Sequence, residues 1–449
     1  MIRDLLSGNR SYSTPFLITI GLLYLLVISG WRVSDALPLR SGRSVGLAGS
    51  GALVMWGVQA DGWNPALLGL KASPKFSLII PSVGLTVGNN AFSPQFITDH
   101  FQEGDTLTEA DKTEILNQMG RDKLTLRFGL GIPVLGFSAG NLAIAVQASN
   151  GLRFSLPRDL FELALTGPRR DVVYDFSTLD LDIASYTTLG ISYAENLSGL
   201  LPFASGEMSV GGTVRYIYGL GFTQLDRKTA TLQVTQDAIH AEGNTRLLTG
   251  TKGGTGYGLD LGWVWAVKKN VLVGLTLGNL IGSITWKDVE AREAIFSRNS
   301  GLHPDSLANS DYYKHFLTQE DTTYTISSHR TPLSRYLLLS GLLIKGHKGF
   351  VGATLYQGFN TTPFQNTTPR LSIGGEWRPI VSFPLRAGFS VGGLEGVELA
   401  GGFGIHLVGY QINLGASWQG GVLTKSKGFS IALTQVITPL PKWEREKSR

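Results

Sequence analysis

The chain has 449 residues, of which 57 are glycine and 16% are charged, and its formal net charge is +5. Glycine is thus roughly twice as frequent as usual and charged residues are scarce, which excludes a disordered chain, while the small, dispersed positive excess does not predict nucleic-acid binding. The absence of cysteine excludes disulfides, thiolate metal sites, cysteine nucleophiles and lipid attachment to cysteine.

The first predicted element is a secretory signal peptide, residues 1–36. Arg3 and Arg10 precede an apolar run over residues 16–28, and Ser34 and Ala36 are the small residues that a cleavage site requires. The alternative is an uncleaved anchor, because the 17 residues from 15 to 31 are at the lower limit of a membrane span. No later stretch has about 18 uninterrupted apolar residues, so no further membrane helix is expected.

From residue 75 onward the dominant pattern is an alternation of period two over segments of about ten residues, which predicts strands. Between residues 124 and 131, for example, the even positions are large and apolar while the odd ones are Thr, Arg and Gly. An apolar face opposite a glycine-rich face with isolated charges is typical of a closed barrel whose exterior meets lipid. We therefore predict an all-β fold, a closed antiparallel transmembrane β-barrel of about 14 strands, over residues 75–437. The expected spans are 76–88, 123–137, 141–155, 182–196, 206–222, 255–267, 271–286, 334–345, 349–359, 369–378, 385–392, 397–408, 410–419 and 428–437.

The connections between these strands alternate between short turns and longer polar loops. Outer-membrane barrels have short periplasmic turns and long external loops, so an even strand count places both ends of the barrel in the periplasm. Two loops are predicted to be helical, residues 108–119 with Thr108 and Asp111 as a capping box, and residues 157–165 ending before Gly167. The charged loop 287–333 is expected to form a solvated surface helix followed by irregular chain. Residues 438–449 are expected to be a periplasmic tail.

The segment before the first strand carries a resemblance to a known family. It contains Gly42-Arg43-Ser44-Val45-Gly46-Leu47-Ala48-Gly49 and then Asp61-Gly62-Trp63-Asn64-Pro65-Ala66-Leu67-Leu68. A glycine-rich run followed by an acidic residue and Trp-Asn-Pro-Ala resembles the FadL-like barrels, which include the long-chain fatty-acid transporters and the PorV-like outer-membrane shuttle of type IX secretion. The stretch from Gly211 to Leu220 is similar to an uncharacterised Bacteroidetes-type branch of that family.

The resemblance implies that residues 37–74 fold into the barrel lumen as a plug. The plug residues that match are Gly46, Gly49, Asp61, Asn64, Pro65 and Ala66. An asparagine followed by proline favours a tight turn, and glycines allow backbone to pass close to the wall. These residues either shape the plug or contact a ligand directly.

The chemistry of a typical enzyme or metal site was not found in the sequence. The seven histidines never have metal-ligand spacing, and there is no Gly-x-Ser-x-Gly nucleophile turn. We therefore predict no catalytic residue, no metal and no cofactor.

Charged residues in phase with the glycine-rich face form the remaining candidate site. Because buried charges need partners, they either brace the barrel and the plug or provide a locus at which an arginine holds an anionic group of a ligand. The lumen-facing candidates are Arg127, Arg215, Asp260, Glu376, Arg386, Glu398 and His406.

Three functions are compatible with the sequence. The first is passage of small hydrophobic compounds across the outer membrane, with lipid and a hydrophobic ligand as partners and an apolar lumen lined by residues such as Val264, Leu272, Leu337 and Leu339. In that hypothesis, by resemblance, the ligand displaces part of the plug and leaves through the barrel wall. The second is a platform whose loops hold an exported protein. The third is a purely structural envelope barrel. Nucleic acid is not an expected partner.

Overall fold

The computed structural model describes residues 41–101, 107–119, 122–198, 206–235, 239–297, 318–407 and 409–439. The predicted signal peptide, residues 1–36, and nearly all of the predicted tail lie outside these ranges, so both stay predictions.

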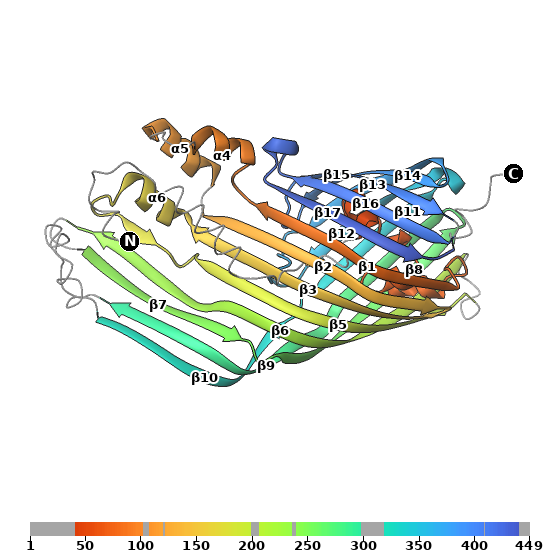
Figure 1. Cartoon of the computed structure of the whole chain (residues 1–449), viewed down its shortest axis with the longest axis horizontal. Helices are drawn as coiled ribbons and strands as arrows, with labels where there is room; N and C mark the ends of the chain where they lie inside the picture. Colours follow the sequence, from red (N-terminus) through yellow and green to blue (C-terminus); the bar gives the residue numbers. More distant parts are fainter. Residues whose placement is uncertain are drawn as a thin grey trace.

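A closed ring of 14 antiparallel strands is the main body of the molecule (Figure 1). Each strand pairs with the next in the ring, and the last strand pairs with the first to close it. The predicted barrel of about 14 strands is therefore confirmed. The ring strands are β1 (Phe76–Asn89), β2 (Lys123–Ala139), β3 (Leu142–Pro157), β5 (Asp180–Asn196), β6 (Glu207–Val234), β8 (Gly254–Lys268), β9 (Val271–Ser297), β11 (Tyr336–Ile344), β12 (Gly349–Gly358), β13 (Arg370–Ile380), β14 (Phe383–Gly392), β15 (Glu398–Leu407), β16 (Tyr410–Gln419) and β17 (Gly428–Ile437).

Three further strands lie outside the ring. They are β4 (Val173–Asp175), β7 (Ile239–Gly250) and β10 (Thr318–Pro332), and they pair with the continuations of β6 and β9 beyond the barrel. We call this part the extension sheet. It projects from one side of the barrel at the end that carries the long loops (Figure 1).

The extension sheet corrects the expectation for the described parts of the loop 287–333, residues 287–297 and 318–333, while the residues between them lie outside the described ranges. Lys287, Asp288, Glu290, Arg292 and Glu293 lie on β9 and not on a surface helix. The reason is that the charges alternate with the buried side chains of Val289 and Ala291, and cross-strand ion pairs stabilise a polar strand. These pairs include Arg227 with Glu293 and Arg292 with Asp321.

Three helices lie in the long loops, α4 (Pro94–His100), α5 (Glu109–Gln118) and α6 (Arg158–Thr166). The two predicted helical loops are confirmed, since Thr108 and Asp111 form the capping box of α5 and Gly167, with φ +73°, ends α6. Two short 3₁₀ turns, η5 (Gly346–Lys348) and η6 (Leu423–Lys425), complete the connections. No helix within the described residues is long and apolar enough to cross a membrane.

The outer face of the ring exposes large apolar side chains. Val214, Trp377 and Ile373 are 63%, 61% and 52% exposed. In contrast, the direct sequence neighbours Arg215 and Glu376 are buried on the inner face. This is the inverse of a water-soluble sandwich, and it is the surface that a barrel presents to lipid.

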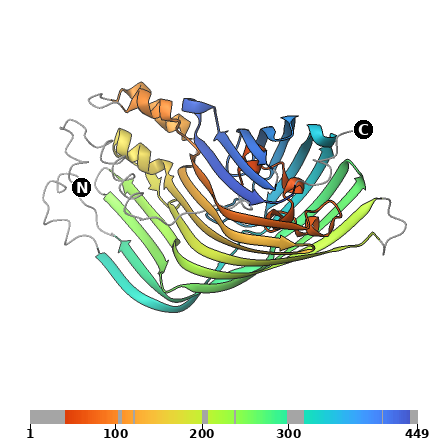
Figure 2. The same cartoon turned by 45° about the vertical axis from the view of Figure 1, so that its right-hand side comes forward.

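Residues 41–75, which we call the inner segment, lie inside the ring (Figure 2). The segment contains α3 (Gly42–Gly46) and the 3₁₀ turns η1 (Ala52–Val54), η2 (Gly57–Ala60) and η3 (Pro65–Gly69). Its apolar side chains are buried against inward-facing residues of the strands, including Ala143, Val264, Leu272 and Leu342. The core of the protein is therefore the contact between this segment and the wall.

Candidate functional site

Glycines on the inner face of four adjacent strands allow the inner segment to lie directly against the wall. A Cβ atom added at Gly388 would lie 2.7 Å from the backbone nitrogen of Ala48, and one at Gly402 would lie 3.1 Å from Cα of Gly46. Equivalent contacts occur at Gly374 on β13 and Gly415 on β16. The glycine-rich face of the alternating pattern is thus a surface for backbone-to-backbone packing.

Replacing one of these glycines is expected to loosen the inner segment. In Gly388→Ala the new methyl group has no room, so we expect a loss of about 1–3 kcal/mol of stability and a rise in single-channel conductance. The matched control is Gly341→Ala on β11, where a Cβ atom would meet nothing within 4 Å. Urea unfolding and planar-bilayer recordings measure the two effects. Equal behaviour of the two variants would show that the close approach does not hold the segment.

The Asn64-Pro65-Ala66 turn is joined to the wall by its asparagine side chain. Asn64 Nδ2 donates to the carbonyl oxygens of Trp263, at 3.2 Å, and Leu275, at 3.1 Å, while its Oδ1 accepts the backbone N–H of Ala66 at 3.1 Å. The two wall residues are partners on β8 and β9. Pro65 begins η3 directly after this cap. Wall glycines again make room for the turn, at positions 211, 262 and 274.

Asp61, Arg215 and Asp260 form a buried triad between the inner segment and the wall. Arg215 Nη2 lies 2.9 Å from Asp61 Oδ1 and 2.6 Å from Asp260 Oδ2. One guanidinium therefore faces two carboxylates, so the triad carries a formal charge of −1. Burial raises the pKa of Asp61 above its usual value, Arg215 opposes that shift, and the Asp260 carboxylate adds to it.

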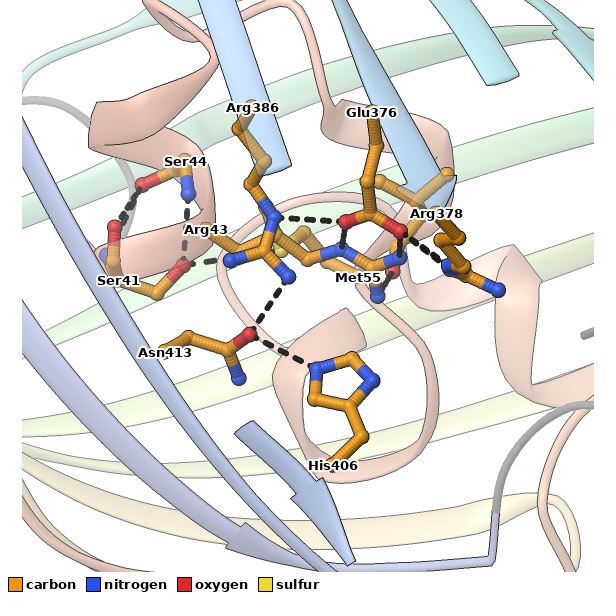
Figure 3. Close-up of polar contacts among 10 residues, drawn as sticks. Ser41, Arg43, Ser44, Met55, Glu376, Arg378, Arg386, His406 and Asn413 are labelled. Carbon is orange, nitrogen blue, oxygen red and sulfur yellow. Dashed lines mark hydrogen bonds and ion pairs between the residues drawn. The ribbon is translucent and has the colours of Figure 1, made fainter. Parts of the chain in front are cut away.

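Glu376 is the centre of a second cluster, in which one carboxylate meets three arginines (Figure 3). It accepts from Arg386 Nε at 2.6 Å and from Arg43 of the inner segment at 3.2 Å, and it also pairs with Arg378. Arg386 Nη2 donates to Asn413 Oδ1 at 2.7 Å. The four charged groups sum to +2, and the inner segment contributes one of the positive charges.

The remaining predicted residues lie at other places on the wall. His406 is 3.1 Å from Asn413 Oδ1, at the edge of the Glu376 cluster (Figure 3). Glu398 pairs with Arg370, whose Nη2 also donates to the carbonyl oxygen of Ala48 at 3.0 Å. Arg127 contacts the carbonyl oxygen of Leu394 in the connection between β14 and β15. Gly49, the residue after Ala48, has φ +80°, a backbone conformation that favours glycine.

Several residues of these clusters were not among the predicted candidates. They are Arg43, Arg370, Arg378 and Asn413. Arg370 and Arg378 are in phase with Glu376 on β13, so the period-two pattern already contained the signal. Arg43 offered no comparable signal, because its partner is more than 300 positions away in the chain.

The predicted apolar lumen residues divide into two groups. Val264 and Leu272 are buried against the inner segment, as a lumen position requires. Leu339, however, is 44% exposed on the outer face, and Leu337 has the same parity, so both are corrected to the lipid side. The inward residues of this strand are Tyr336, Leu338 and Leu342. Leucines occupy both faces of the strand, so alternation of apolar and polar residues could not identify the inward face.

The wall has an interruption between β1 and β2. The two strands pair up to Ile79 and Gly136 and resume at Gly84 and Gly131, so residues 80–83 and 132–135 are not paired with one another. Each stretch contains a proline, Pro81 or Pro133, which has no N–H group to donate to a ladder. The continuous register on both sides shows that the strands separate locally and then rejoin.

Both strands carry a bulge at the interruption. The pairing of β1 with β17 shifts between Ile80 and Val83, and that of β2 with β3 shifts between Pro133 and Leu135. On the lumen side the inner segment covers the edge of the interruption with Val58, which is 1% exposed. Val58 packs in a small apolar cluster with Ile79, Ala145 and Val436.

Within the described ranges, no group of three or more His, Asp or Glu side chains is placed to hold a metal ion. The ionic groups near the inner segment instead pair with one another. The site therefore consists of the inner segment, held inside the barrel by apolar contacts and ion pairs, next to an interruption in the barrel wall.

Comparisons with known proteins give one family and several barrels of similar fold. Residues 65–253, less than half of the chain, match a family of unknown function, DUF5723. No curated protein matches the sequence. Nothing in these matches assigns the chain to a bacterial group, and the Bacteroidetes-type branch stays a prediction.

Three of the similar solved structures are two toluene transporters and a FadL homologue. The toluene transporter TodX of Pseudomonas putida is 11% identical with a TM-score of 0.49, and the toluene transporter TbuX of Ralstonia pickettii is 12% identical with a TM-score of 0.49. A FadL homologue of Pseudomonas aeruginosa is 12% identical with a TM-score of 0.48. Each alignment covers 90% of this chain and 99% of the other.

Proposed function

We propose that this chain passes small hydrophobic compounds across the outer membrane. The inner segment acts as the plug of the barrel, and cargo leaves the lumen through the interruption between β1 and β2. The interruption is the observation that supports this most directly, because a purely structural barrel has no need of an unpaired stretch in its wall.

The physical basis of such passage is partitioning between apolar surfaces. Cargo enters from the end that carries the long loops, where apolar side chains such as Phe92, Ile115 and Met119 cluster beneath the loop helices. On the lipid-facing side of the interruption Leu135 is 54% exposed. An apolar compound gains about 25 cal/mol for each Å² that it removes from water, so no cofactor is required. The toluene transporters among the similar structures are consistent with cargo of this class.

Bridging the interruption is expected to stop transport. Residues Ser82 and Pro133 face each other across it, by the register of the flanking pairs, and the chain has no native cysteine. A protein carrying Ser82→Cys and Pro133→Cys, joined by a short bifunctional thiol reagent, should take up radiolabelled toluene or a long-chain fatty acid at least about tenfold more slowly in proteoliposomes. The expected reason is that the linker obstructs the unpaired stretch through which cargo would leave.

The matched control places the same bridge on the intact ladder at Thr86 and Gly129, which are paired. Its uptake should equal that of the unbridged protein. Unchanged uptake in the bridged Ser82/Pro133 protein would exclude exit through this part of the wall. No uptake of either probe by the unmodified protein would favour a structural barrel instead.

We also propose that residues 1–36 are a signal peptide removed during export to the outer membrane. The support is the sequence pattern of two arginines, an apolar run and small residues at the cleavage site. Mass spectrometry of the protein from its native membrane should give a mature chain that starts at Leu37. A chain that retains residues 1–36 would identify the segment as an anchor.

A further inference from the structure

Strand β9 bends where the barrel becomes the extension sheet. Its pairing with β8 shifts between the pairs Leu261–Leu277 and Leu259–Ile281, so the chain gains two residues on β9 at this point. Asn279 lies within the shift and has φ +48°. Beyond the bend, β9 leaves β11 and pairs with β10. Asn279 therefore occupies the junction between the two parts of the fold.

The side chain and backbone of Asn279 are tied in two directions. Its backbone N–H donates to Asp260 Oδ1 at 2.7 Å, and its Nδ2 donates to the carbonyl oxygen of Ser334 at 2.9 Å. Asp260 in turn holds Arg215, and Arg215 reaches Asp61 of the inner segment. A continuous series of polar contacts therefore runs from the inner segment to the bend.

Through Ser334, the bend also connects to the loop between β12 and β13. Ser334 Oγ is 2.8 Å from Thr362 Oγ1, and the carbonyl oxygen of Leu333 accepts from Asn360 Nδ2 at 2.9 Å. Leu333 is buried in the apolar cluster that contains Trp286 of β9. The corner at residues 333–335 is thus packed both against the extension sheet and against the loop between β12 and β13.

We propose that Asp61, Arg215, Asp260 and Asn279 couple the inner segment to the extension sheet, so that displacement of the segment loosens the bend in β9. Arg215 is shared by two carboxylates, so the departure of Asp61 changes the geometry of its contact with Asp260. Asp260 is the group that holds the left-handed backbone at Asn279. A few residues at a bend can absorb a change in φ and ψ, so the extension sheet can move relative to the barrel without disruption of either part.

The Glu376 cluster provides a natural comparison. It also holds the inner segment, through Arg43, but its strands β13 and β14 lie wholly in the ring and have no continuation into the extension sheet. Releasing the segment at Arg43 should therefore leave the extension sheet unaffected.

Amide hydrogen exchange of the full chain in lipid nanodiscs tests the coupling. Asp61→Ala should accelerate exchange in β7 and β10 at least about fivefold, the lower end of typical coupling between sites. Arg43→Gln should not accelerate exchange in these strands. Asn279→Gly keeps the positive φ and the backbone N–H contact with Asp260 but removes the amide contact with Ser334. Because the bend is then already loosened on one side, Asp61→Ala should accelerate exchange in β7 and β10 less in this background than it does alone.

The outcomes are separable from those of transport, because exchange is measured without cargo. Unchanged exchange in β7 and β10 of Asp61→Ala would overturn the coupling, as would equal acceleration by Arg43→Gln or fully additive effects with Asn279→Gly. Heat-modifiable migration on gels reports whether each variant has folded. Where Asp61→Ala does not fold, Asp61→Asn, which keeps the size of the side chain, is compared in the same way.

Discussion

Replacement of Glu376 by glutamine is expected to destabilise the protein by about 3–5 kcal/mol, as is found when one partner of a buried ion pair is removed. The change removes the carboxylate charge that Arg43, Arg378 and Arg386 share, and both Glu376 and Arg386 have fully buried side chains. The formal charge of the cluster rises from +2 to +3. Because Arg43 belongs to the inner segment, the segment should also lose its hold on β13.

Urea unfolding in detergent measures this loss, and limited proteolysis of residues 41–75 reports release of the segment. The matched control is Glu109→Gln on α5, whose ion pair with Lys112 is exposed and should contribute no more than about 1 kcal/mol. If Glu376→Gln were as stable as this control, the arginines would have to find other partners. In that case the cluster would not hold the segment in place.

Replacement of Arg215 by leucine is the second change with a large expected effect. It leaves the carboxylates of Asp61 and Asp260 buried without their shared guanidinium, so we expect a loss of about 3–5 kcal/mol. Val214→Ala, on the lipid-facing side of the same strand, is the control and should cost much less, because Val214 is 63% exposed. An unchanged unfolding midpoint for Arg215→Leu together with lost uptake of cargo would assign Arg215 to ligand binding instead.

Asp61→Asn should be milder than Arg215→Leu, because it leaves one neutral pair, and it should change the dependence on pH. Burial raises the pKa of Asp61 above 3.8, so the folded protein binds this proton more tightly than the unfolded chain. The contribution of the protonated Asp61 side chain to the free energy of unfolding is fully present below pH 3.8, and it is lost as pH rises through the pKa of Asp61 in the folded protein. The difference in unfolding free energy between wild type and Asp61→Asn should therefore shrink or reverse in favour of the variant over that interval. A constant difference would show that Asp61 does not titrate there.

The strand pattern could be predicted because it is local. Alternation of apolar and small residues marks each strand and assigns each side chain to one face, and all fourteen predicted spans coincide with ring strands. The capping box at Thr108 and the glycine that ends α6 are local signals of the same kind. The prediction failed for β10 and the outer part of β9, where charged side chains resembled a solvated helix and only cross-strand partners made a strand stable.

The sequence by itself determined the fold class, the number of ring strands and the face on which Arg215, Asp260 and Glu376 lie. Only the tertiary structure decided which charges meet, that Arg43 and Asp61 of the inner segment complete two of the clusters, and where the wall is interrupted. The physical reason is that the period of two specifies the direction of a side chain but not its height in the barrel. Height depends on the register between neighbouring strands, and that register is established only when the ring closes.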